Sequence, residues 1–161
     1  MPAMPAISTQ IAAHLSQLVV LCDTGFALAV HIRFTSPALL YRTYSSDWIE
    51  YYSERGFVMQ DPVVRRGLMQ AGTVLWADLA DEDPAGVISA AAAHGLVNGW
   101  NYAVGPATSR TLCGFTRSGA AFTAAQMDQG RAIVDSIHAL TEGIEHFSPA
   151  ELAALRALVP A

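Results

Sequence analysis

Residues 26–41, FALAVHIRFTSPALLY, decide the fold class of this chain. The run from Phe26 to Phe34 is mostly apolar and predicts a β-strand, and Ala38 to Tyr41, or a little beyond, predicts its antiparallel neighbour. Thr35-Ser-Pro37 between them has the composition of a turn. A β-hairpin is therefore the first element of the predicted sheet.

A second hairpin is predicted in the C-terminal half of the chain. Its strands run from about Trp100 to Val104 and from Thr111 to Thr116, and the turn-rich Gly105-Pro-Ala-Thr-Ser109 joins them. Thr73 to Trp76 predicts one further short strand between the two hairpins. Together these segments predict a central antiparallel sheet of about five strands.

Helices are predicted around these strands from apolar residues at helical spacing and from capping residues. Ser8 or Thr9 is a candidate cap for the first helix, and Asp61-Pro62 and Asp83-Pro84 are strong helix starts. The predicted helices span residues 8–22, 48–55, 61–70, 83–94 and 122–144. The predicted fold class is α+β, an α-β-α sandwich with a PAS- or GAF-like central antiparallel sheet.

The composition of the 161 residues favours a protein with a buried ligand or a partner subunit. Apolar residues make up 52% of the chain and charged residues only 14%, which leaves apolar surface to be covered. The net charge of −5 argues against nucleic-acid binding by the chain itself, since neutralising phosphates requires a cationic face. The sequence has no membrane-spanning apolar run and no signal-like N-terminus, so we expect a cytoplasmic protein.

Motifs for enzymatic chemistry are missing from the sequence. It contains no Gly-x-Ser-x-Gly elbow, no glycine-rich phosphate loop and no His-Glu-x-x-His pair. Cys22 and Cys113 form no redox or metal motif and are expected to be small buried residues, whereas His138 and His146 are expected at the surface or at an interface. We therefore expect a binding protein, not an enzyme, with no cofactor and no metal.

One stretch departs from ordinary core patterning because it combines aromatic rings with hydrogen-bonding groups. Tyr44, Trp48 and Tyr52 are spaced by four residues, and Asp61-Pro62 and Trp76 follow them. Trp48 and Tyr52 share one helix face at this spacing, which suits a pocket for a ligand with a polar head and an apolar tail. By spacing alone, an aromatic face of the ordinary core is the better interpretation, and Asp61 is a simple helix cap.

Taken in order, these residues resemble the signature of the autoinducer-binding domain of LuxR-type quorum-sensing regulators, the receptors for N-acyl-homoserine lactones. Residues 51–57 (YYSERGF), Val63-Val64 and residues 94–99 (HGLVNG) also resemble the family, and the likeness covers about residues 8–145. It implies that residues 1–145 form a signal-receptor domain. Such a domain would bind an N-acyl-homoserine lactone in a buried pocket and so control dimerisation and transcription.

The resemblance also implies how the head of the ligand is held. The Trp48 indole N–H would donate to the lactone carbonyl, and the Asp61 carboxylate would accept the ligand's amide N–H. The Tyr44 hydroxyl would reach the acyl carbonyl, with the Thr116 hydroxyl helping from the facing strand. These four groups can together satisfy an amide and a lactone in a dry pocket.

A larger set of apolar contacts is implied in the same way. Tyr52 and Trp76 would pack on the lactone ring and the start of the acyl chain. The residues implied for the tail pocket are Leu40, Val64, Val87, Ala91, Leu96 and Phe115. The sequence departs from the family at residues 100–104, WNYAV, where an Ile-Pro-type pair is usual.

Residues 146–161 are expected to be a linker and the start of a second domain. The segment from Ser148 to Arg156 resembles the first helix of the family's helix-turn-helix domain, and Ser148 with Glu151 predicts a capping box. We expect either a truncated chain or a natural short protein, which would not bind specific DNA alone. Its expected partner is a second copy in a homodimer. The alternatives are a longer regulator that it inhibits by heterodimerisation, or a role as a GAF-like sensor of another small molecule.

Overall fold

The computed structural model describes residues 5–161 and contains a five-stranded sheet in which all neighbouring strands are antiparallel. The strands are β1 (Phe26–Arg33), β2 (Ser36–Arg42), β3 (Gly72–Leu75), β4 (Trp100–Val104) and β5 (Arg110–Phe115). Their order across the sheet is β2-β1-β5-β4-β3, so the two hairpins are joined through β1 and β5. The antiparallel sheet predicted from the hairpins is confirmed.

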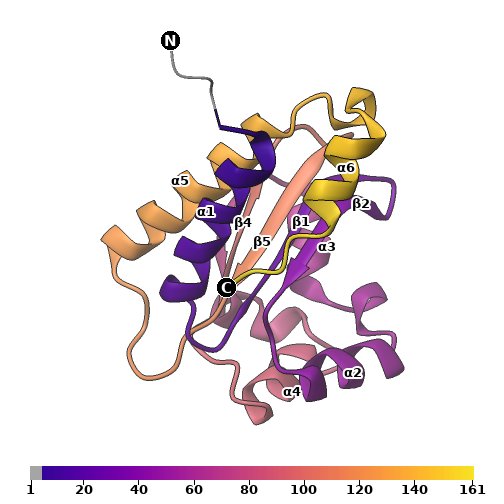
Figure 1. Ribbon diagram of the computed structural model, residues 1–161. Helices are drawn as coiled ribbons and strands as arrows, with labels where there is room; N and C mark the ends of the chain where they lie inside the picture. Colours follow the sequence, from indigo (N-terminus) through magenta and orange to yellow (C-terminus); the bar gives the residue numbers. More distant parts are fainter. Residues whose placement is uncertain (1–4) are drawn as a thin grey trace.

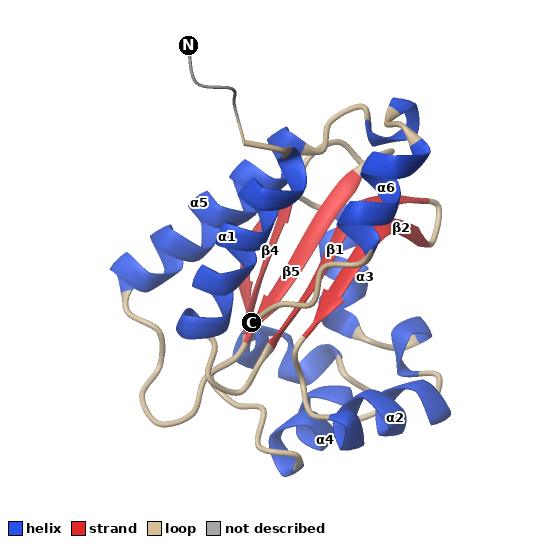
Figure 2. Cartoon of the chain, in the orientation of Figure 1, coloured by secondary structure: helices blue, strands red, loops and turns tan. Residues whose placement is uncertain are grey.

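Helices surround this sheet on both faces (Figures 1 and 2). The α-helices are α1 (Ile7–Leu21), α2 (Ser46–Glu54), α3 (Pro62–Met69), α4 (Val87–Ala93), α5 (Ala124–Leu140) and α6 (Pro149–Arg156), and the 3₁₀ helices are η1 (Phe57–Met59), η2 (Trp76–Glu82) and η3 (Ile144–His146). In Figure 1, α1, α5 and α6 lie in front of the sheet, α3 lies behind it, and α2 and α4 lie at its lower end. The predicted α+β sandwich is confirmed. No helix within residues 5–161 has the length and hydropathy to cross a bilayer.

Some helices begin at the capping residues predicted from the sequence, and others do not. Asp61 caps α3, as predicted, by accepting a hydrogen bond from the Val63 N–H. The predicted caps of the first helix, Ser8 and Thr9, are wrong, because α1 already begins at Ile7 after Ala6, which makes no side-chain cap. This helix depends instead on its apolar face, whose buried residues are Ile11, Leu15, Leu18 and Leu21.

The face of the sheet beneath α1 and α5 carries the larger hydrophobic core. Alternate residues of β1 point into it, because successive side chains of a strand face opposite sides. Trp100 of β4 stacks on Phe115 of β5 in this core, with ring centroids 3.9 Å apart. Cys22 and Cys113 are free, buried thiols in the same core, as predicted. The opposite face is left for a second, smaller set of side chains.

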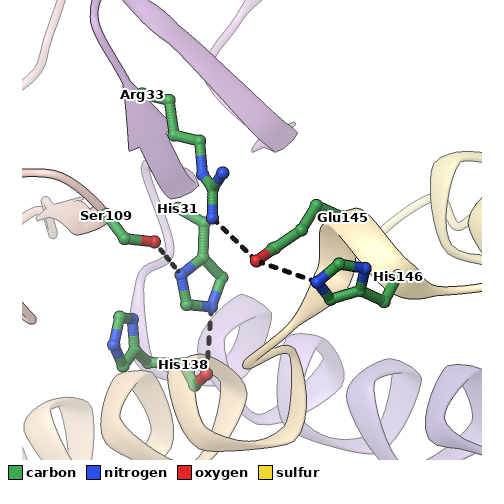
Figure 3. Close-up of polar contacts among 6 residues, drawn as sticks. All are labelled: His31, Arg33, Ser109, His138, Glu145 and His146. Carbon is green, nitrogen blue, oxygen red and sulfur yellow. Dashed lines mark hydrogen bonds and ion pairs between the residues drawn. The ribbon is translucent and has the colours of Figure 1, made fainter.

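A buried histidine pair lies where β1 bulges. His31 has a φ of +48°, in the left-handed region that residues other than glycine rarely adopt, and the register with β5 shifts between Ala29 and Ile32. Its imidazole stacks on that of His138 from α5, with centroids 4.3 Å apart (Figure 3). The His31 ring nitrogens lie 2.7 Å from Ser109 Oγ and 3.1 Å from the His138 carbonyl oxygen. The prediction that His138 lies at the surface is wrong, because α5 places its ring against the sheet.

Acid is expected to destabilise the fold through this pair. Burial and the adjacent His31 lower the pKa of His138 below its ordinary value of 6.5, against weaker opposing effects of Glu142 and Asp135. The unfolded chain therefore binds a proton more readily than the folded chain, so stability is lost as the pH falls below about 6.5. Replacing His138 with glutamine should flatten the decline in free energy of unfolding between about pH 7.5 and about pH 5, measured by urea denaturation.

The matched control for this experiment is His146→Gln. The His146 side chain is exposed and lies outside the stacked pair, next to Glu145 (Figure 3). This variant should retain the slope of the wild type. A decline in the His138→Gln variant as steep as that of the wild type would contradict the assignment of the acid sensitivity to the pair.

The C-terminal helix α6 packs against the larger core. Leu155 is 1% exposed and belongs to that core, and α6 contacts α1 and β2. The Tyr41 hydroxyl of β2 donates to the Leu155 carbonyl oxygen at 2.8 Å, and burial raises the pKa of Tyr41 to about 12. An exposed ion pair between Arg33 and Glu145, 3.0 Å long, lies at the approach to this helix (Figure 3). Residues 148–156 thus fold onto the sheet.

Candidate functional site

A second cluster of buried side chains lies at the end of the sheet where α2 and α4 are found. Its residues come from α2, η1, η2, α4 and the loops beside them. They are Trp48, Phe57, Val87, Ala91 and Leu96, with Tyr44, Tyr51, Tyr52, Trp76, Ala85 and Ala90 packed around them, and we refer to this set as the aromatic cluster. Most of the ligand contacts expected from the sequence fall within it.

Trp48 lies at the centre of the aromatic cluster. The helical spacing of α2 brings its ring against Tyr51 and Tyr52, at centroid distances of 6.0 and 5.7 Å, and His94 lies 5.1 Å away. The Trp48 side chain is 5% exposed, yet its indole N–H forms no hydrogen bond with residues 5–161. This N–H is not among the fully buried unpaired atoms of residues 5–161, so it reaches solvent and is free to donate to an added acceptor.

Tyr52 and Asp61 form a hydrogen-bonded pair beside Trp48. The Tyr52 hydroxyl donates to Asp61 Oδ2 at 2.8 Å, and the Val63 N–H donates to Oδ1 at 2.9 Å. Burial raises the pKa of the Asp61 carboxyl, although these two bonds oppose the shift, and burial with the Asp61 charge raises the pKa of Tyr52. A carboxylate has about four lone-pair sites, so Asp61 retains capacity to accept another N–H.

Two glycines, Gly99 immediately before β4 and Gly114 in β5, make room for the remaining polar rings. The Trp76 indole N–H donates to Asn101 Oδ1 at 2.7 Å, and a Cβ on Gly99 would overlap this indole. The Tyr44 hydroxyl donates to the Gly114 carbonyl oxygen at 3.4 Å, and a Cβ on Gly114 would stand 3.2 Å from that hydroxyl. The missing side chains of Gly99 and Gly114 therefore let Trp76 and Tyr44 lie directly on the sheet.

Three apolar residues expected in the tail pocket lie outside the aromatic cluster. Phe115 points to the opposite face of the sheet, where it stacks on Trp100 in the larger core. Leu40 on β2 is 48% exposed. Val64 lies half-buried on α3, next to the Asp61 cap. The structure thus brings together Val87, Ala91 and Leu96 from the predicted tail set, but not these three.

The Thr116 hydroxyl has protein partners in this structure. It donates to the Gly25 carbonyl oxygen at 2.8 Å and accepts from the Thr24 hydroxyl at 2.8 Å. Thr116 is fully buried at the end of β5. A threonine hydroxyl has two acceptor lone pairs, so one remains after these contacts.

Sequence reasoning missed several residues that shape the site. Asn101, Gly99 and Gly114 position the two polar rings, and the His94 ring covers Trp48 and Tyr51 at centroid distances of 5.1 and 4.8 Å. Asn101 carried a usable signal, because asparagine is depleted in strands and this one sits inside a predicted strand. Gly99 and Gly114 carried no such sequence signal, since their role depends on rings from distant parts of the chain.

A cleft of about 410 Å³ opens beside the aromatic cluster. Its lining residues are Asp23, Thr24, Thr43, Ser45, His94, Gly95 and Leu96. Leu96 belongs to the aromatic cluster, so the cleft reaches its edge. A larger cleft of about 620 Å³ lies between α3 and η2 and contains none of the expected ligand contacts. Within residues 5–161, no three His, Cys, Asp or Glu side chains are placed to hold a metal ion.

Several solved structures share this fold. SdiA in complex with octanoyl-rac-glycerol has a TM-score of 0.64 at 20% identity, over 93% of this chain and 67% of that one. A crystal structure of Escherichia coli SdiA has a TM-score of 0.62 at 22% identity, over 89% of this chain and 66% of that one. The N-acylhomoserine lactone dependent LuxR family factor CepR2 from Burkholderia cenocepacia has a TM-score of 0.61 at 16% identity, over 94% of this chain and 97% of that one. The chain thus spans about two thirds of the length of SdiA.

The family itself is shown by the sequence comparison. No curated protein sequence matches this chain. Residues 22–141, however, match the family described as the autoinducer binding domain, and this range includes the whole sheet and the aromatic cluster. Domains of this family are ligand-binding signal receptors and not enzymes. The chain therefore belongs to the autoinducer-binding domain family of LuxR-type quorum-sensing regulators.

Proposed function

We propose that this domain binds an N-acyl-homoserine lactone, with the lactone head beside Trp48 and the acyl tail among the apolar residues of the aromatic cluster. The observation that carries the proposal is the Trp48 indole N–H, which has no partner within residues 5–161 although its side chain is 5% exposed. The lactone carbonyl would supply the missing acceptor. The family match supports a small-molecule ligand of this kind.

The neighbouring polar groups can satisfy the ligand's amide. Asp61 has acceptor capacity left for the amide N–H after its bonds to Tyr52 and Val63. The Tyr44 hydroxyl makes only a long bond of 3.4 Å to Gly114, so it can turn to the acyl carbonyl at little cost. The Thr116 hydroxyl donates to the Gly25 carbonyl oxygen, so in this proposal it helps to hold the acyl carbonyl by turning its proton from that bond to the ligand.

The acyl tail is proposed to lie among Val87, Ala91 and Leu96. These side chains pack with Trp48 in one buried group, so the ligand has to separate them in order to bind. Part of the binding free energy is then used for this opening. Because the ligand binds the folded domain and not the unfolded chain, it also stabilises the domain by mass action.

A different amphiphile is the alternative ligand, and the SdiA complex is the observation that favours it. SdiA was solved with octanoyl-rac-glycerol, which has an acyl chain and a polar head without a lactone ring. The Trp48 N–H and the Tyr44 hydroxyl could donate to the oxygens of such a head as well. Both ligand classes need the same apolar tail site.

We also propose that ligand binding in the cytoplasm controls pairing with a second copy, and through it transcription. The composition supports pairing, since only 14% of residues are charged and large apolar side chains such as Val20 and Val159 are exposed. Pairing with a longer related regulator, and inhibition of it, is the alternative to pairing with a second copy, and the same exposed apolar side chains support it.

Replacing Trp48 with phenylalanine tests the head-group contacts. The change keeps an aromatic ring in the cluster but removes one donor, so lactone binding should weaken by about 1 kcal/mol, or roughly fivefold. Isothermal titration with homoserine lactones of increasing acyl length measures the effect. Asp61→Asn should also weaken binding, because the amide offers one acceptor oxygen in place of two.

The matched control is Trp100→Phe, which removes an indole N–H on the opposite face of the sheet. It should leave the dissociation constant unchanged. Equal affinity of the wild type, Trp48→Phe and Asp61→Asn for every lactone would rule out the proposed contacts. If the wild type binds an acyl glycerol but no lactone, the alternative ligand class is correct.

A further inference from the structure

Asn101 is a buried polar residue of the ligand face that the proposed head-group contacts do not use. It lies on β4 opposite Gly114 of β5 and Val74 of β3, and it is 8% exposed. A polar amide in the interior of a sheet requires hydrogen-bond partners. The oxygen and the amino group of the Asn101 amide therefore each need a partner.

The Trp76 contact fixes the orientation of this amide. An indole N–H can only donate, so the Asn101 atom 2.7 Å from Trp76 Nε1 has to be the carbonyl oxygen Oδ1. The other end, the Nδ2 amino group, then carries two donors. Within residues 5–161 these donors meet no acceptor, and Nδ2 is not sealed among the fully buried unpaired atoms. Asn101 thus presents an accessible, unused donor group on a largely buried side chain.

The Asn101 side chain lies beside the Tyr44 hydroxyl. The position that a Gly114 side chain would take is 3.0 Å from Asn101 Oδ1 and 3.2 Å from the Tyr44 hydroxyl. The Asn101 and Tyr44 side chains therefore meet above Gly114, and the Asn101 atom nearest to this position is Oδ1, which also accepts from Trp76. In the proposed function Tyr44 bonds the acyl carbonyl, so Asn101 faces the chain close to the ligand's amide.

We infer that Asn101 is a specificity-determining residue, whose Nδ2 group donates a hydrogen bond to an oxygen on the acyl chain near the amide. The inference rests on the proposed function and narrows its ligand class to lactones with an oxygen-substituted chain. An acyl chain made of methylene groups alone would displace the water from the Nδ2 donors and would offer them no acceptor in its place. An oxygen-substituted chain replaces the lost water with a direct bond.

The test compares two ligands that differ only at this position. Titrations of the wild type with N-octanoyl-homoserine lactone and N-(3-oxooctanoyl)-homoserine lactone should show a preference of roughly fivefold for the 3-oxo compound. Asn101→Leu should abolish that preference, mainly by improving the binding of the unsubstituted compound. Asn101→Ala, which only removes atoms, gives the same comparison without the risk of overpacking.

A third variant, Trp76→Phe, tests whether the Trp76 bond orients Asn101. It removes the indole N–H that fixes the amide but retains the Asn101 side chain, so the preference for the 3-oxo compound should decrease without being abolished. Equal binding of both lactones by the wild type, or an unchanged preference in Asn101→Leu and Asn101→Ala, would overturn the inference while leaving the lactone proposal intact. Failure of the wild type to bind either lactone would instead overturn the lactone proposal.

Discussion

Replacing Leu155 with alanine is expected to lower the free energy of unfolding by about 3 kcal/mol. Leu155 is 1% exposed and packs into the larger core from α6, so the substitution removes buried apolar atoms and leaves a cavity. The Tyr41 hydroxyl bonds the Leu155 carbonyl oxygen, and this bond to the backbone survives the change of side chain. Helix α6 should therefore stay in place, which limits relaxation around the cavity. Urea denaturation of the ligand-free protein measures the loss.

Val159→Ala is the matched control for this prediction. Val159 follows α6 and is 84% exposed, so its truncation should change the free energy of unfolding by less than about 0.5 kcal/mol. If the two variants were equally stable, α6 would be detached from the sheet in solution. A large loss at Leu155 alone would show that the segment after residue 145 belongs to the energetics of the receptor domain.

The expectation that this segment starts a separate unit came from its resemblance to the first helix of a helix-turn-helix domain and from its capping residues. The capping box of Ser148 and Glu151 is present in the structure, so the prediction of a helix start is confirmed. A capping box and an apolar stripe specify where a helix begins and that one face of it is buried. They do not specify which surface buries that face. Here the stripe packs on the core through Leu152, Leu155 and Leu158.

Local signals also account for most of the fold that could be predicted. The predicted strand 100–104 coincides with β4, and the helix predicted from Asp61-Pro62 coincides with α3 within one residue. The last long helix is shorter than predicted, because it starts after the Thr123 cap and ends at Leu140, before the left-handed Gly143. The 3₁₀ helix η2 was not predicted, since such short helices lack an apolar period of their own.

The candidate site was predictable where it depends on one helix and unpredictable where it depends on the sheet. Trp48 and Tyr52 meet because they are one turn apart, which sequence spacing shows directly. Phe115 and Thr116 were both expected at the ligand, but the alternation of side chains along β5 places Phe115 in the larger core, and Thr116 follows the end of the strand. Asn101 meets Trp76 only through the pairing of β4 with β3, which spacing does not reveal.

Replacing Gly99 with alanine is expected to lower the free energy of unfolding by about 2 kcal/mol and to weaken ligand binding. A Cβ at this position would overlap the fused-ring atoms of the Trp76 indole, which is rigid and cannot bend away. The whole Trp76 side chain has to turn toward solvent, and its bond to Asn101 is then broken. The aromatic cluster loses one wall, whereas the strand pairing of β4 is kept.

A double-mutant cycle isolates this mechanism. In a Trp76→Ala background the indole is gone, so adding Gly99→Ala should change the free energy of unfolding by less than about 0.5 kcal/mol. Urea denaturation of the wild type, the two single variants and the double variant gives the coupling energy between the positions. An equal cost of Gly99→Ala in both backgrounds would mean that the backbone just before β4, and not the Trp76 ring, requires glycine. A coupling near 2 kcal/mol would identify Gly99 as the residue that lets the sheet serve as the base of the ligand pocket.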